Sequence, residues 1–112
     1  MHNELNKKLD FLEKNIFLSL KNINDGFDSK SIYYFSESDF EIILKRVESY
    51  GLGIYGIEPW FEGDFYGVLA CEDYNQSPSD SRWYKKAFSK FKNKKKNLQY
   101  SATYQIPKKL LK

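Results

Sequence analysis

Histidine is almost missing from this sequence of 112 residues, and the single one, His2, lies beside the N-terminus. One histidine cannot build a Ser–His–Asp triad, a histidine-based acid–base pair or a zinc cluster. Cysteine also occurs once, at Cys71, so no disulfide can form within the chain and a reducing compartment is predicted. We therefore expect no catalytic site, no metal and no cofactor.

Long apolar runs are missing as well. No window approaches the roughly 20 apolar residues that span a bilayer. Charged residues interrupt every apolar run near the N-terminus, which leaves no core for a signal peptide. These absences predict a cytoplasmic protein that makes no membrane contact. The length suits one domain over residues 1–112.

Acidic residues are missing from the last third of the chain. Residues 82–112 hold eleven basic side chains and no acidic one, whereas residues 31–81 hold ten acidic side chains against Lys45 and Arg46. The formal net charge of +3 therefore hides two opposite poles. Such a separation bears on partners more than on the fold.

The hydrophobic pattern divides the chain into an N-terminal helix over 1–26 and an α+β core over 31–107. Six apolar residues recur at steps of three and four and predict the amphipathic helix: Leu5, Leu9, Leu12, Ile16, Leu20 and Ile23. In the core, strands are predicted over 32–35, 52–60, 65–73 and 98–106, and helices over 36–50 and 82–92. Ser36 is the expected N-cap of the first core helix, and Gly51 its stop.

The predicted order of the core is β-α-β-β-α-β, with residues 61–64 forming a hairpin connection. This order indicates a ferredoxin-like fold, an antiparallel sheet with two helices on one face, here extended by the N-terminal helix. The last strand alternates strictly between apolar and polar residues, so we expect its polar face to be wet.

Two patterns resemble enzyme signatures without their context. Gly51-x-Gly53-x-x-Gly56 matches a dinucleotide fingerprint but joins a helix to a strand, where that fingerprint joins a strand to a helix. Carboxylate pairs around Glu58 and Glu72 suit solvated strand ends and a hairpin better than a glycosidase or a cation site.

The segment 57–64 places two large rings among three carboxylates. Pro59 indicates an edge or a bend, because proline cannot donate a ladder hydrogen bond. An acidic, aromatic hairpin of this kind suits a basic protein surface, with charge steering the encounter. The candidate partner-binding residues are Glu58, Trp60, Glu62, Asp64, Glu72 and Asp73.

Residues 35–60 resemble the immunity proteins that neutralise tRNA-cleaving colicins. There a short helix precedes a Gly-Leu-x-Ile-x-Gly-Ile-acidic segment and a tryptophan, matched here by Gly56, Ile57, Glu58 and Trp60. The resemblance implies a ferredoxin-like fold and binding to a cognate toxin domain, with imitation of its RNA substrate. It implies contact roles for Glu58 and Trp60.

Two other functions stay open. The basic third favours a small nucleic-acid-binding module that uses Lys85, Lys86, Lys90, Lys94, Lys95 and Lys96. The N-terminal helix is also compatible with a structural subunit that dimerises. The oligomeric state does not follow from the sequence.

Overall fold

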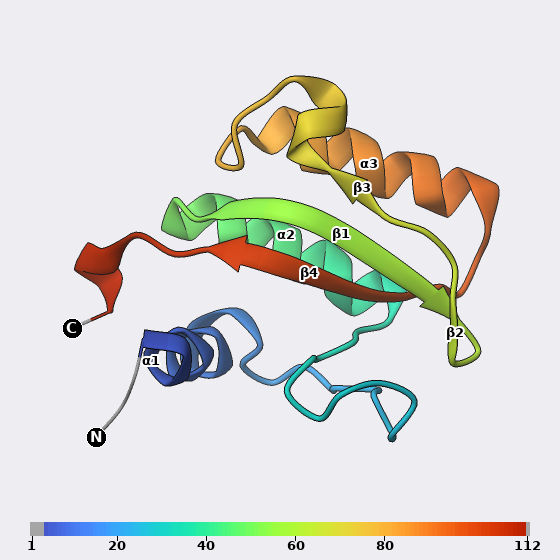
Figure 1. The fold of residues 1–112 in the computed structure, drawn as a ribbon, viewed down its shortest axis with the longest axis horizontal. Coiled ribbons are helices and arrows are strands. Elements are labelled where there is room, and N and C mark those ends of the chain that lie inside the picture. Colours follow the sequence, from blue (N-terminus) through green and yellow to red (C-terminus); the bar gives the residue numbers. More distant parts are fainter. Residues whose placement is uncertain (1–3, 112) are drawn as a thin grey trace.

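The computed structural model describes residues 4–111 and shows an α+β fold with a four-stranded antiparallel sheet. The central strand, β1 (Gly53–Phe61), pairs along one edge with β4 (Gln99–Gln105). Along its other edge it pairs with two short strands, β2 (Asp64–Phe65) and β3 (Leu69–Ala70). Figure 1 shows β1 between β4 and the β2–β3 segment.

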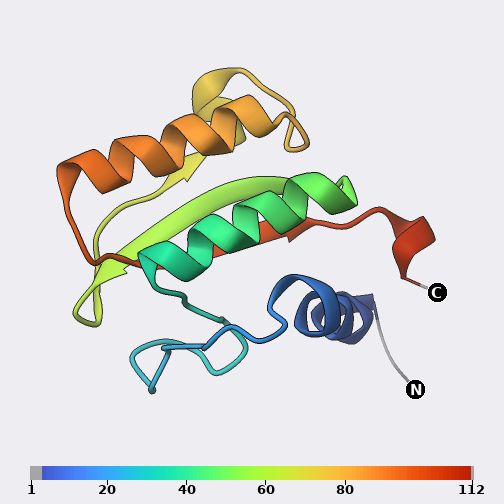
Figure 2. The ribbon, with the colours of Figure 1, turned by 180° about the vertical axis from the view of Figure 1, so that it is seen from behind.

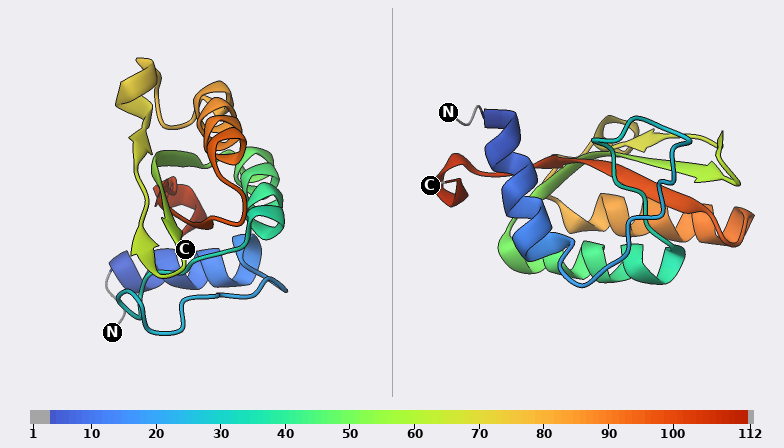
Figure 3. Two further views of the ribbon diagram at one scale, coloured as in Figure 1. Left: turned by 90° about the vertical axis from the view of Figure 1, so that its right-hand side faces the viewer. Right: turned by 90° about the horizontal axis from the view of Figure 1, so that it is seen from below.

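Two helices cover one face of this sheet (Figures 2 and 3). They are α2 (Glu37–Tyr50) and α3 (Ser81–Lys94), and their apolar stripes are buried as the sequence predicts. Ile54 and Ile57 of β1 contribute to the same core and are fully buried. Tyr100 of β4 lies between the helices, stacked on Phe40 with ring centroids 5.1 Å apart.

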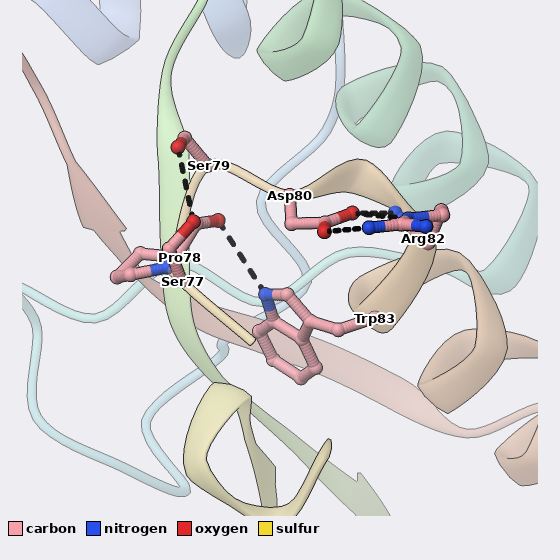
Figure 4. A network of polar contacts seen from close by, with 6 residues as sticks. All are labelled: Ser77, Pro78, Ser79, Asp80, Arg82 and Trp83. Carbon is pink, nitrogen blue, oxygen red and sulfur yellow. Dashed lines mark hydrogen bonds and ion pairs between the residues drawn. The ribbon is translucent and has the colours of Figure 1, made fainter. Parts of the chain in front are cut away.

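The structure confirms both predicted ends of α2. Ser36 accepts a hydrogen bond from the Asp39 amide, and Gly51 ends α2 in the left-handed region with φ 72°. Asp80 caps α3, and the Arg82 guanidinium binds both of its carboxylate oxygens (Figure 4). Those two bonds and the bond from the Arg82 amide lower the pKa of Asp80 to about 2.

The N-terminal helix is shorter than the predicted 1–26. It comprises α1 (Glu4–Phe11) and a π-helical turn, η1 (Leu12–Ile16), and residues 1–3 lie outside the described part. Arg46 donates to the carbonyls of Ile16 and Leu18, which satisfies the helix end. Ser19 then takes a left-handed φ of 67°. The chain leaves the helix here although the apolar spacing continues.

The first predicted strand, 32–35, is reduced to one antiparallel bridge between Phe35 and Tyr100. The sheet still has four strands, because β2 and β3 are separate short strands. The ferredoxin-like order is not confirmed. The predicted strand 65–73 is interrupted because the amides of Tyr66 and Gly67 both bond to the Pro59 carbonyl. It ends in a 3-10 turn, η2 (Cys71–Tyr74), and a second such turn, η3 (Lys108–Leu110), follows β4.

Candidate partner-binding surface

The face of β1 that points away from α2 and α3 carries the predicted contact residues. Side chains alternate along a strand, so Gly56, Glu58 and Trp60 share this face while Ile57 and Pro59 are buried on the other. We call it the open face. Its neighbours by register are Phe65 on β2, and Gln99, Ser101 and Thr103 on β4.

Glu58 and Trp60 form a preorganised pair on the open face. The Trp60 indole Nε1 donates to Glu58 Oε2 at 2.7 Å, and both side chains are half-buried. Phe65 meets the Trp60 ring edge-on at 6.2 Å between centroids and is 58% exposed. A carboxylate is thus fixed by a half-buried indole, which in turn contacts an exposed ring, an arrangement that suits recognition of a cationic partner group.

The irregular segment 22–34 supports Trp60 from outside the sheet. Phe27 and Tyr34 contact the indole with centroids 5.5 and 5.7 Å away. The Tyr34 hydroxyl donates to Asp28, and burial together with that bond raises the pKa of Tyr34. The Asn24 side chain holds the segment together through bonds to the backbone of residues 26, 28, 29 and 32.

This support was not predicted from the sequence. The predicted helix over 1–26 runs into this segment and ends at Asn24-Asp25-Gly26, because such residues end helices and form loops alike. The signal that was present is the density of Asn, Asp and Ser over 22–31, whose side chains compete for backbone hydrogen bonds.

The hairpin after Trp60 adds two exposed carboxylates. Phe61 pairs with Asp64, so Glu62 and Gly63 form a two-residue turn with φ 49° and 85°, a type I′ geometry. The amide of Gly63 is held by the Gln99 side chain at 2.9 Å. Glu62 and Asp64 therefore project from a fixed turn next to the Glu58–Trp60 pair.

Glu72 and Asp73 lie elsewhere. They belong to η2, beside the first half of β1, whereas the hairpin is at its end (Figure 1). Asp73 is occupied with its own turn, because its carboxylate accepts from the Ala70 amide at 2.8 Å. The structure therefore brings four of the six predicted residues together and leaves these two apart.

None of the five candidate carboxylates forms an ion pair within the described residues. The three salt bridges found there join Arg82 to Asp80, Lys85 to Glu48 and Lys92 to Glu41. The charges of Glu58, Glu62 and Asp64 are thus available to a partner.

A groove of about 230 Å³ indents the open face beside this cluster. We call it the sheet groove. Its apolar lining includes Leu9, Leu12 and Phe17 from the N-terminal segment, and Ile32 and Tyr33 from the segment before α2. Figure 3 shows that α1 runs across the direction of the strands.

The floor of the sheet groove comes from β1 and β4. Glu58, Ser101, Thr103 and Tyr104 line it, together with Val68 from the segment between β2 and β3. Ser101, expected on a wet face, is buried and donates to the Glu58 carbonyl at 3.2 Å. Part of the β4 face predicted to be wet is therefore covered by the N-terminal segment.

The six lysines of the alternative interface are exposed on α3 and the turn that follows it. Lys85 is engaged by Glu48 at 2.9 Å, and Lys95 lies over the Phe61 ring at 4.0 Å. Lys90 and Lys94 border a second hollow of about 290 Å³ with Tyr66 and Phe91. The six lysines are all exposed, but Lys85 and Lys95 make contacts within the chain.

No group of three His, Cys, Asp or Glu side chains among the described residues gathers in a way that could hold a metal ion. No helix described in the structure has the length and apolar character of a membrane crossing. Cys71 is buried.

Comparison with protein-family models, with curated proteins and with solved structures gave no match. The function of the chain is therefore inferred from the geometry of the open face and from the resemblance of residues 35–60.

Proposed function

We propose that the chain is a non-catalytic immunity protein, which binds a bacterial toxin domain in the cytoplasm and neutralises it. The observation that carries the proposal is the Glu58–Trp60 pair at 2.7 Å on the open face. Glu62 and Asp64 extend the same surface, and no basic side chain described in the structure forms an ion pair with them.

A nuclease is the toxin class that this surface fits. Nuclease clefts are lined with basic side chains that attract phosphates, and carboxylates beside a ring are complementary to them. Opposite charge also speeds the encounter, which an inhibitor needs. The resemblance to the colicin immunity proteins supports the choice of toxin class, and it also implies a ferredoxin-like strand order. The geometry of the open face supports the choice of contact residues.

The neighbouring open reading frame supplies the test. We expect the gene directly upstream to encode a large secreted protein with a nuclease-like C-terminal domain. Expression of that domain alone should stop growth, and co-expression of this chain should restore it. Restored growth with the Glu58→Gln/Trp60→Phe variant at the same level as with the unaltered chain would overturn the surface assignment. A toxic domain that the unaltered chain does not neutralise would overturn the function.

A nucleic-acid-binding module is the second candidate, because Lys90 and Lys94 flank a hollow next to the exposed Tyr66 ring. Basic side chains beside an exposed aromatic ring suit the binding of a single-stranded nucleic acid. This function requires affinity for RNA that falls steeply as salt rises. Absence of RNA binding at low salt would exclude it.

A further inference from the structure

We propose that the sheet groove receives one arginine side chain of the protein partner, with the Glu58 carboxylate as its acceptor. The inference rests on the proposed function and names the chemical group that the site selects. It follows from the charge, the size and the wall chemistry of the groove.

Charge is the first argument. Glu58 is the one ionisable carboxylate among the residues that line the groove, and no lysine or arginine lines it. Glu58 Oε2 is bound by Trp60, while no partner of Oε1 is found among the described residues. A half-buried carboxylate with a free oxygen attracts a cationic donor, and a charge-assisted hydrogen bond is about twice as strong as a neutral one.

Size is the second argument. The volume of about 230 Å³ lies below the roughly 300–1,000 Å³ of pockets for whole small molecules, and it suits a single side chain. The groove opens on the surface beside Ile32 and Val68, which are 38% and 56% exposed. A partner that rests on this apolar rim can therefore insert one residue.

Wall chemistry separates arginine from other cations. Leu12, Phe17 and Val68 offer apolar contact to a methylene stem. The Tyr33 ring lines the groove with one face stacked on Phe17 at 5.1 Å between centroids, and a planar guanidinium stacks on the other face of such a ring better than an ammonium does. Ser31 and Thr103 add hydroxyl acceptors, and the five donors of a guanidinium use several acceptors at once.

The two tryptophans provide the measurement. The Trp60 indole N–H binds Glu58 at the groove, while the Trp83 indole N–H binds the Pro78 carbonyl at 3.4 Å, outside it (Figure 4). Two-dimensional ¹H–¹⁵N NMR resolves both signals in one titration of the full chain. The probe is N-acetyl-arginine amide, and its neutral isostere, N-acetyl-citrulline amide, is the control.

We expect a saturable shift of the Trp60 signal with the arginine probe, none with citrulline, and no shift of the Trp83 signal. Glu58→Gln keeps an acceptor for the indole and removes the charge, and should weaken binding about tenfold. Glu41→Gln removes one charge from α2, on the other face of the sheet, and should leave the affinity for the arginine probe unchanged.

Three results would overturn the inference: no saturable Trp60 shift, equal shifts with both probes, or equal losses in the two variants. Equal affinity for N-acetyl-lysine amide would overturn the choice of arginine. Failure of the toxin test gives a different pattern. The groove then still binds the arginine probe while no toxin is neutralised.

Discussion

Glu62 holds a backbone conformation that suits asparagine better than glutamate. Its φ of 49° lies in the left-handed region, at the first central position of the type I′ turn. The chain places asparagine at two other left-handed positions, Asn75 with φ 53° and Asn97 with φ 63°. We predict that Glu62→Asn stabilises the fold and weakens partner binding.

The magnitude follows from the backbone. A left-handed conformation costs a residue with a Cβ about 1–2 kcal/mol, and asparagine tolerates it better than glutamate. No ion pair or hydrogen bond of the exposed Glu62 side chain is found within the described residues, so its removal sacrifices no internal contact. The net gain should be about 0.5–1 kcal/mol, which raises Tm by about 2–6 °C for a domain of this size.

Thermal denaturation and toxin affinity are measured on the same preparations. Glu62→Gln is the matched control, because it removes the charge and keeps the strained backbone. It should weaken binding without raising Tm. Equal Tm values for the two variants would refute the strain argument, and unchanged affinity in both would refute the contact role of Glu62.

Three further predictions concern the core. Tyr100→Phe should change the free energy of unfolding by less than about 1 kcal/mol, because the buried hydroxyl has no partner among the described groups; a loss above about 2 kcal/mol in urea unfolding would contradict this. Burial raises the pKa of Tyr84 to about 12. The contribution of Tyr84 to the free energy of unfolding should therefore be full below pH 10 and decline as the pH rises toward 12. Tyr84→Phe should flatten that decline in alkaline unfolding, and an unchanged decline would refute the assignment. Gly53→Ala should destabilise by about 1–3 kcal/mol in urea unfolding, since a Cβ would lie 2.6 Å from Gln105 Oε1 and 2.9 Å from the Pro78 carbonyl carbon; unaltered stability would contradict this packing.

Local patterns predicted the helices of the core well. The stripe of α2 and its cap at Ser36 depend on neighbouring residues alone, and both are present in the structure. The turn at Glu62-Gly63 was predicted for the same reason. Periodicity and capping are short-range properties, so a sequence displays them directly.

Contacts between residues far apart in the sequence could not be predicted in this way. The helix spacing continues through Leu20 and Ile23, yet the helix ends at Ile16, where Arg46 binds the carbonyls of Ile16 and Leu18. Likewise Phe35 pairs with Tyr100 at a single position, which shortens the first predicted strand. These outcomes depend on residues far apart in the sequence, which no local pattern reveals.

The candidate site shows the same division. Strand alternation predicts that Glu58 and Trp60 share a face, and they do. Glu72 and Asp73 were grouped with them by charge alone, but η2 carries them to the other half of β1. The groove could not be predicted, because its walls come from α1, the 31–33 segment and the sheet together.

The most direct measurement is the affinity of the upstream-encoded toxin domain for two double variants of this chain. Glu58→Gln/Trp60→Phe alters the open face while it keeps a ring in the half-buried site, and Lys90→Ala/Lys94→Ala alters the basic surface. We predict a loss of about 100-fold or more for the first variant, as hot-spot residues show, and none for the second. Unchanged affinity for the first variant together with a large loss for the second would contradict the account.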